Sequence, residues 1–269
     1  MDPSYPRNAV RTKHVFAEGF DAGSREKLVL VIPTLREVRN IRTLLAQVVA
    51  ALTMLPIEFE VLVVDDDSGD GIEAEVAAIA SAEPRVKFLV RTGQRGLAGA
   101  VLHGWCHTDA TILATMDADM QHPPALLPRL VQAVLEGCDL VIGSRYARGN
   151  APESWHLGRK FISRAAIWAT RPLQGMRMSV CDPMSGYFVV RRHCVEGIAF
   201  QSCGFKLLLE ILVRGRVGKV EEIPFAFGRR AAGRSKAGMC VAMGYGLLLV
   251  RLYGARMAAG QRMHEAAGD

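Results

Sequence analysis

The chain has 269 residues, 50% of them hydrophobic, with a formal net charge of +6 and a pI near 9.1. This length and composition exclude a fully disordered chain and allow one large α/β domain, with or without a short appendage. The positive charge indicates an anionic partner, which could be phosphate groups, a lipid surface or nucleic acid.

Alternating strand and helix patterns run through the first half of the chain. Hydrophobic runs predict buried strands over residues 28–34, 59–64, 86–90, 112–116 and 139–142. Helical patterns are expected over 41–49, 72–82, 97–107 and 123–136, with Gly137 as a C-cap. This alternation predicts a mostly parallel sheet with helices on both sides. Polar clusters at 33–37, 65–67 and 117–121 should therefore converge at the carboxyl edge of the sheet, where such folds bind ligands.

The second half of the chain has a different character. We expect a helix over 157–170, a strand ending near 189, a helix over 205–214, a strand over 219–227, a basic loop over 229–236 and a last helix over 238–258. The hydrophobic run 237–250 is shorter than the roughly 20 residues that span a membrane, so it predicts a helix that lies on a membrane or a partner, with a buried core helix as the alternative. We divide the chain into a disordered extension without a secretory signal (1–24), a main α/β domain (25–237) and an interface helix with its tail (238–269).

The cysteines carry information about the compartment. All six are scattered, without a C-x-x-C pair or zinc-finger spacing. We therefore expect buried free thiols in a reducing compartment, of which the cytoplasm is the simplest.

The segment 111–122 contains the most informative pattern. Five mostly hydrophobic residues lead into Asp117, Asp119 and Gln121. In an extended chain, side chains at alternate positions point the same way, so these three would present oxygen atoms to one side. Such atoms suit Mg²⁺ or Mn²⁺, and we predict a metal and diphosphate site. For an isolated Asp-x-Asp, a solvated acidic turn would be the better interpretation.

The acidic loop and the glycines of the first half each resemble a known binding motif. The acidic loop 65–71 begins like an EF-hand, but its twelfth position from Asp66 is Ala77, where a bidentate Glu is required. We prefer a contact with a nucleotide base or ribose. The glycines Gly93, Gly96 and Gly99 fit neither a dinucleotide fingerprint nor a P-loop.

Basic residues are candidates for binding phosphate. Arg145 follows the fifth strand, and the loop 229–236 carries four cations, which repel one another unless an anion is present. Nucleic acid is disfavoured as a partner because the loop has no interleaved aromatic residues. His122 and Cys181 are expected to be structural.

Several segments together resemble a known family. Residues 33–37, 64–68, 96–97, 117–122, 143–146, 204–206 and 224–236 resemble the GT-A family 2 glycosyltransferases, and most closely the dolichol-phosphate (polyprenol-phosphate) mannosyltransferases. The similarity covers about residues 28–240. The first half alone would specify only the superfamily, and the later motifs indicate the polyprenyl-phosphate branch.

The resemblance implies a GT-A fold and a set of roles. It assigns donor binding to Pro33, Leu35, Glu37, Val64, Asp66, Asp117, Ala118, Asp119, Gln121, Arg145, Arg230 and Lys236. It places the metal on Asp119 and Gln121, and it makes Asp117, Asp119 and Arg145 catalytic. The acceptor phosphate is expected at Arg145, Arg159 and Ser163.

The sequence also departs from the family pattern. The family usually reads Pro-Thr-Tyr-Asn-Glu where this chain has Leu35 and Arg36, so a tyrosine that stacks on the base of the donor is lost. It usually reads Gly-Glu-Ser-Lys-Leu where this chain has Arg234 and Ala237, and the replacement of an acid by a base should alter pairing within the loop and acceptor binding.

The resemblance implies transfer of mannose from GDP-mannose to a polyprenyl phosphate, with inversion and with Mg²⁺ or Mn²⁺. The acceptor phosphate has a second pKa of about 6 and is already an oxyanion, so no strong general base is required. We expect a protein at the cytoplasmic face of a membrane, in peripheral contact with it, that borrows a membrane-anchoring partner as some relatives do. The alternatives are a UDP-sugar donor or a non-catalytic nucleotide-sugar-binding subunit. A nucleic-acid-binding module ranks well below both.

Overall fold

The computed structural model describes residues 26–93, 95–147, 168–174, 180–200, 206–226, 246, 249–250 and 252–254. The expected extension 1–24, the basic loop 229–236, and most of the helices expected over 157–170 and 238–258 lie outside these residues.

The described residues form one seven-stranded sheet. Its strands are β1 (Lys27–Thr34), β2 (Glu58–Asp65), β3 (Val86–Val90), β4 (Ile112–Thr115), β5 (Leu140–Ser144), β6 (Phe188–Arg191) and β7 (Val220–Pro224). They are arranged in the order β3-β2-β1-β4-β6-β5-β7. All neighbours are parallel except β6, which is antiparallel to both β4 and β5. The predicted mostly parallel sheet is confirmed, with the antiparallel β6 as an addition that the sequence pattern did not reveal.

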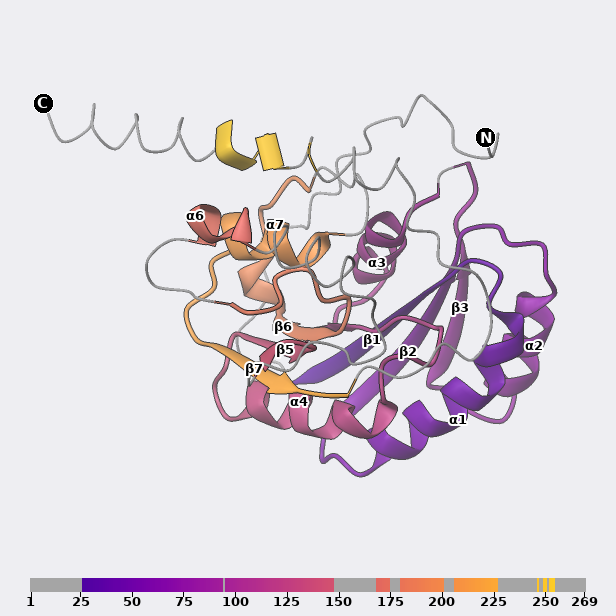
Figure 1. Ribbon diagram of the computed structural model, residues 1–269. Coiled ribbons are helices and arrows are strands. Elements are labelled where there is room, and N and C mark those ends of the chain that lie inside the picture. Colours follow the sequence, from indigo (N-terminus) through magenta and orange to yellow (C-terminus); the bar gives the residue numbers. More distant parts are fainter. Residues whose placement is uncertain are drawn as a thin grey trace, which may run out of the picture.

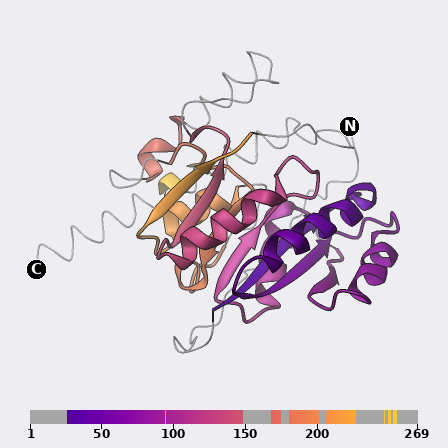
Figure 2. The same ribbon diagram turned by 90° about the horizontal axis from the view of Figure 1, so that it is seen from below.

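Helices cover both faces of this sheet. They are α1 (Val38–Thr53), α2 (Ile72–Ala80), α3 (Leu97–Cys106), the 3₁₀ turn η1 (Pro124–Leu126) that leads into α4 (Leu127–Leu135), α6 (Arg171–Gln174), the 3₁₀ turn η3 (Arg192–Cys194) and α7 (Leu207–Arg214). Helices α1, α2 and α4 lie on one face, and α3 and α7 lie on the other (Figures 1 and 2). The layers are those expected for alternating strands and helices.

The central strand β1 shows why the first hydrophobic run is continuous. Leu28, Leu30 and Ile32 pack on the side of α1 and α4, whereas Val29 and Val31 pack on the side of α3 and α7. Each of these side chains is fully buried. Since successive side chains of a strand point to opposite faces, a strand that is covered on both sides must be hydrophobic at every position.

A smaller hydrophobic cluster lies beside α7. Leu173, Leu209 and Leu252 are buried against one another, and the Tyr253 hydroxyl donates a hydrogen bond to the carbonyl oxygen of Ala169 at 2.8 Å. These contacts attach the described part of the last helix to α6 and α7. None of the helices formed by the described residues is both long enough and hydrophobic enough to cross a membrane.

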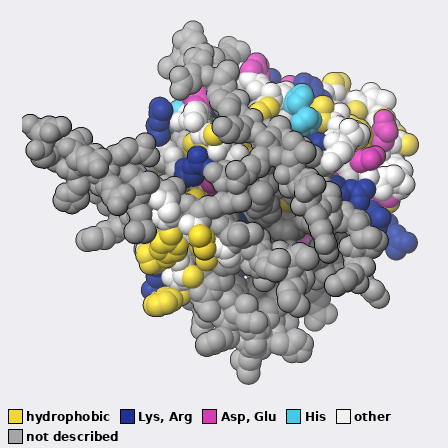
Figure 3. Space-filling view, turned by 90° about the horizontal axis from the view of Figure 1, so that it is seen from above, with side chains coloured by type: hydrophobic (Ala, Val, Ile, Leu, Met, Phe, Trp, Pro, Cys, Tyr) yellow, Lys and Arg dark blue, Asp and Glu magenta, His cyan; other side chains and the backbone are white. Residues whose placement is uncertain are grey.

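Some large hydrophobic side chains are exposed near this cluster. Trp168 and Val250 are each 71% exposed. Viewed from above, hydrophobic side chains of the described residues gather on one side of the molecule (Figure 3).

The expectation of buried cysteines is correct only in part. Cys138 and Cys194 are buried, but Cys106 and Cys181 are exposed. Cys106 is the last residue of helix α3, and Cys181 lies in the loop before β6.

Candidate active site

Three loops that are far apart in sequence meet at one edge of the sheet. Strands β1, β2 and β4 are parallel neighbours, so the residues that follow Thr34, Asp65 and Thr115 emerge together. The Thr34 hydroxyl donates a hydrogen bond to Asp65 Oδ1 at 2.8 Å, and the Asp66 N–H donates to the carbonyl oxygen of Thr34 at 3.1 Å. The expected convergence of the polar clusters is confirmed. Pro33, Leu35 and Glu37 lie at this edge with Val64 and Asp66.

Carboxylates of the acidic loop bind the backbone of the loops themselves. Asp65 Oδ2 accepts the Ser68 N–H at 2.7 Å, and Ser68 Oγ in turn accepts the Arg36 N–H at 2.8 Å. Asp70 accepts the N–H groups of Val38 and Ile72, at 3.1 and 3.2 Å, where α1 and α2 begin. These hydrogen bonds fix the loops after β1 and β2 relative to each other.

Asp66 is 3% exposed and ties the end of β2 to the start of α3. Its Oδ1 accepts a hydrogen bond from Arg91 Nε at 2.8 Å, and its Oδ2 accepts one from the Gly96 N–H at 2.6 Å. Burial raises the pKa of Asp66, against the opposing effects of these two donors. A Cβ at Gly99 would lie 2.5 Å from Arg91 Nη1, so this glycine makes room for the guanidinium. The family role for Asp66, contact with the nucleoside, stays a prediction.

Backbone strain is concentrated at the same edge. Among the described residues, only three that are not glycine have a positive φ: Arg36 (62°), Asp67 (53°) and Met120 (64°). One lies in each of the loops that follow β1, β2 and β4. Non-glycine residues in sparsely populated conformations persist where the surrounding structure holds them, and they cluster at functional sites.

The expected extended chain over residues 117–121 is wrong. Strand β4 ends at Thr115, and the chain turns at Met120. The Gln121 N–H donates a hydrogen bond to Asp119 Oδ1 at 3.1 Å, which holds that turn. Asp119 is 7% exposed, whereas the side chain of Asp117 is 32% exposed. Asp117, Ala118, Asp119 and Gln121 thus reach the edge through a turn.

His122 is a buried, neutral packing residue, as the sequence led us to expect. Its Nδ1 accepts the Asp117 N–H at 3.1 Å, and its ring stacks on Tyr187 with 5.0 Å between centroids. Burial lowers the pKa of His122 to about 4. The 3.8 Å separation between His122 Nδ1 and Asp117 Oδ2 is therefore not an ion pair at neutral pH.

The segment before β6 packs directly against Asp117. A Cβ at Gly186 would lie 3.1 Å from Asp117 Oδ1, so any larger residue would crowd the carboxylate. Ser185 Oγ donates a hydrogen bond to the carbonyl oxygen of Gly143 at 2.7 Å, which fixes this segment to the end of β5. The sequence pattern alone assigns no role to this segment.

Arg145 is held by a buried carboxylate. Its Nε and Nη2 donate to Asp182 Oδ2 and Oδ1, both at 2.7 Å, and Asp182 is fully buried. Glu222 accepts the N–H groups of Cys181 and Asp182, at 2.7 and 3.0 Å, and so holds Asp182 in position. Burial alone would lower the pKa of Arg145, but the interactions with Asp182 prevail and raise it. The guanidinium is a fixed positive charge next to the site.

Lys206 is a further cation that our sequence reasoning did not assign. It precedes α7 and is half-buried. Burial is the main cause that lowers the pKa of Lys206 to about 8, and the positive charge of Arg145 contributes to the same shift. The carboxylates of Asp182 and Asp117 oppose this change. These interactions place the ammonium in the neighbourhood of Arg145 and Asp117. In the sequence, Lys206 is marked only by the motif at 204–206, which forms part of the family resemblance.

Four residues of the expected site lie outside the described part of the chain: Arg159, Ser163, Arg230 and Lys236.

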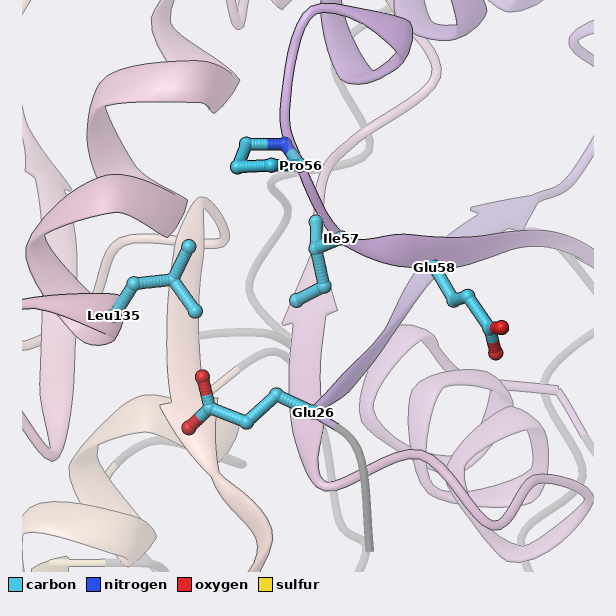
Figure 4. Close-up of a pocket in the computed structure, with 5 residues that line it drawn as sticks. All are labelled: Glu26, Pro56, Ile57, Glu58 and Leu135. Atoms are coloured by element: carbon cyan, nitrogen blue, oxygen red, sulfur yellow. The ribbon is translucent and has the colours of Figure 1, made fainter.

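A cavity of about 560 Å³ lies at the opposite edge of the sheet and is lined by Glu26, Pro56, Ile57, Glu58 and Leu135 (Figure 4). Glu26 and Glu58 lie at the amino ends of β1 and β2, so this cavity is separate from the Asp117 edge. Glu26 also pairs with Arg191 at 2.6 Å.

Comparison with known proteins identifies the domain. The model of the family described as glycosyl transferase family 2 matches residues 29–198. The chain belongs to this family. The resemblance inferred from the motifs is therefore confirmed, and the described edge lies within a family 2 glycosyltransferase domain.

Several relatives carry the name dolichol-phosphate mannosyltransferase. A dolichol-phosphate mannosyltransferase from Pyrococcus furiosus is 41% identical over 78% of this chain, which spans 59% of the length of that relative. Dolichol-phosphate mannosyltransferases from Mycosarcoma maydis and Saccharomyces cerevisiae are each 34% identical, over 91% and 83% of this chain and 85% and 86% of their own lengths.

Solved structures share the fold. A glucosyl-3-phosphoglycerate synthase from Mycobacterium tuberculosis, in complex with Mn²⁺, UDP and glucosyl-3-phosphoglycerate, has a TM-score of 0.63 and is 21% identical, covering 85% of this chain and 80% of that one. The same enzyme with Mg²⁺ and UDP has a TM-score of 0.64 at 21% identity, covering 85% and 79%. At this level of identity the comparison establishes the GT-A fold only.

Proposed function

We propose that the protein transfers mannose from GDP-mannose to a polyprenyl phosphate at the cytoplasmic face of a membrane, with inversion at the anomeric carbon. The observation that carries this proposal is the similarity to dolichol-phosphate mannosyltransferases over 78–91% of the chain. The gathering of the described family-motif residues at one edge of the sheet supports it. Function is argued from this edge because a fold by itself does not specify an activity.

The residues at the edge fit a divalent metal ion. Asp119 and Gln121 offer a carboxylate and an amide oxygen, which are the hard donors that Mg²⁺ and Mn²⁺ prefer. The hydrogen bond from the Gln121 N–H to Asp119 Oδ1 orients the carboxylate. The Mycobacterium tuberculosis enzyme with the same fold was solved with Mn²⁺ or Mg²⁺ and UDP. When bound, such an ion would stabilise the charge on the departing nucleoside diphosphate.

Cations of the chain would align the two anionic reactants. Arg145 is positioned by its two hydrogen bonds to Asp182, and Lys206 adds a second positive charge in the neighbourhood of Asp117. The acceptor phosphate is already an oxyanion near neutral pH, so its attack depends on orientation and charge stabilisation more than on a general base. By the resemblance, Arg159 and Ser163 hold the acceptor phosphate, and Arg230 and Lys236 hold the donor phosphates.

A donor other than GDP-mannose is the nearest alternative. Leu35 stands where the family usually has a tyrosine, and the solved structures with this fold contain UDP. A UDP-sugar would use the same acceptor and the same metal. A non-catalytic subunit would bind nucleotide sugar without turnover.

The experiment incubates the purified protein with labelled GDP-mannose, a polyprenyl phosphate and Mg²⁺ or Mn²⁺, and then extracts the lipid into organic solvent. Parallel reactions contain UDP-sugars or a chelator. We expect label in the lipid phase only with GDP-mannose and metal. Label that reaches the lipid phase from a UDP-sugar and not from GDP-mannose would show that the donor is a UDP-sugar. If no donor gives lipid-phase label, even when membranes are added as a source of a partner protein, the non-catalytic alternative is supported.

A further inference from the structure

A second group of metal-binding side chains lies away from the proposed catalytic edge. Asp139 directly precedes β5, and His193 and Cys194 lie in the turn η3 that follows β6. Because β5 and β6 are antiparallel, the start of one lies beside the end of the other. Strand β6 is also antiparallel to β4, so this is the edge opposite to Asp117.

The ligand atoms of the three side chains lie close together. His193 Nε2 lies 3.5 Å from Asp139 Oδ1 and 3.4 Å from Cys194 Sγ. The ligand atoms of all three lie within 4.8 Å of one another. In a tetrahedral zinc site, bonds of about 2.0–2.3 Å place neighbouring ligand atoms about 3.3–3.8 Å apart. The two separations from His193 agree with that geometry.

A proton relay between a nucleophile, a histidine and a carboxylate does not explain the arrangement of these three side chains. In a nucleophile–histidine–carboxylate arrangement, the two partners bind different ring nitrogens, so that a proton can move between them. Here Asp139 and Cys194 both approach Nε2 of His193.

Backbone donors hold the carboxylate in position. Asp139 Oδ2 accepts the N–H groups of Gly218 and Lys219 at 2.8 and 3.0 Å, which directs Oδ1 toward His193. A Cβ at Gly218 would lie 2.8 Å from Asp139 Oδ2, so the close approach requires glycine. Hydrogen bonds that orient a ligand in this way are usual around metal ions in proteins.

We propose that Asp139, His193 and Cys194 bind a divalent transition-metal ion such as Zn²⁺. Nitrogen and sulfur donors favour zinc over magnesium, which distinguishes this site from the one at Asp119. The His193 side chain is 58% exposed, so water completes the coordination from the solvent side. On binding, the Cys194 thiol releases its proton to solvent, and the ion connects the start of β5 to the turn after β6.

The test uses Co²⁺ as a spectroscopic substitute for Zn²⁺ in the full-length protein. We expect a thiolate-to-cobalt charge-transfer band that Zn²⁺ abolishes by competition. The variant His193→Ala should lose this band while its circular dichroism is unchanged, because the side chain is largely exposed. Cys194→Ser should lose it as well. If Cys194→Ser, a substitution at a buried position, prevents folding, the loss or retention of the band in His193→Ala decides the test.

Two control variants identify the source of the band. Cys106→Ser removes an exposed thiol next to His107 and should keep the band. Asp119→Ala removes the proposed catalytic ligand and should also keep it, so the result does not depend on the proposed function. The proposal is overturned if the wild-type protein gives no band, if His193→Ala retains it, or if Cys106→Ser loses it.

Discussion

Arg36 adopts a backbone conformation that is unfavourable for its side chain. Its φ is 62°, and the left-handed region costs an L-residue about 1–2 kcal/mol relative to the right-handed one. Asparagine tolerates this region better, and it is the residue that the family usually has here. We expect Arg36→Asn to raise the free energy of unfolding by about 0.5–1 kcal/mol, measured by urea denaturation.

The matched control is the same substitution at Arg39, an exposed position within helix α1. There asparagine is the poorer helix former, and the free energy of unfolding should fall by up to about 0.5 kcal/mol. Equal effects at the two positions would contradict the role of backbone strain at Arg36.

The charge of Lys206 should lower the free energy of unfolding of the protein without substrates, and it should speed sugar transfer. Its pKa of about 8 lies below the ordinary 10.5, so folding disfavours the charged form. At pH 7 the Lys206 ammonium is charged in both the folded and the unfolded state, so the full free-energy cost of burying the charge lowers stability. This cost diminishes as the pH rises from 8 towards 10.5. We expect Lys206→Met to raise the free energy of unfolding at pH 7 by about 1–2 kcal/mol, less than the full shift because the side chain is half-buried.

The same variant should slow sugar transfer about 10- to 100-fold, because a charge-assisted hydrogen bond to an anionic reactant contributes about 1.5–3 kcal/mol. Denaturation curves at pH 7 and at pH 9 and transfer assays measure both effects. A variant that is less stable than wild type, or equally active, would contradict this assignment.

Individual residues of the site could be predicted from the sequence only where a motif carried them. Asp117 and Arg145 were found in this way, and the structure places both beside the segment 182–186. Asp182 was not, because its role depends on the packing of a loop onto a residue 37 positions away. A pairing between segments that distant leaves no periodic signal in one sequence.

At the scale of elements, the close packing of α3 against the sheet can be tested at Gly104. A Cβ there would lie 2.7 Å from Val31 Cγ2 and 3.1 Å from Val64 Cγ2, both of them buried side chains of the sheet. Gly104→Ala should lower the free energy of unfolding by about 1–3 kcal/mol, since inserted methyl groups strain a packed core.

Gly254, a helical glycine with open space around the position of a Cβ, provides the control. Gly254→Ala should be neutral or slightly stabilising, because alanine favours helix. Destabilisation of similar size in both variants would contradict the packing argument.

The elements themselves were largely predictable, because buried parallel strands and amphipathic helices have distinct periodicities. The direction of β6 was not, since periodicity does not encode whether a strand runs parallel or antiparallel to its neighbours. The turn at Met120 was also missed. Its positive φ opposes the preference of methionine, so local propensity gave no indication of it.

At the scale of the whole molecule, we expect contact with a lipid surface. Trp168 and Val250 are both 71% exposed, and the net charge is +6. Transfer of such side chains from water is worth about 1.5–3 kcal/mol each. The double variant with Trp168→Ser and Val250→Ser should sediment at least about tenfold less with vesicles that contain anionic lipid.

Met54, which is 81% exposed at the end of α1, is the matched control. Met54→Ser should sediment like the wild type. Equal sedimentation of the double variant and the wild type would refute the proposed membrane contact.

The most direct test of the central claim is the transfer of labelled mannose to polyprenyl phosphate by Asp119→Ala, measured together with its thermal unfolding. Asp119 Oδ1 accepts the Gln121 N–H within the turn after β4, at the edge of the sheet and outside the regular strands and helices, so the fold should survive its replacement. We predict that lipid-phase label disappears while the unfolding midpoint stays within a few degrees of wild type. Full activity in this variant would contradict the assignment of the metal, and of the reaction, to this edge of the sheet.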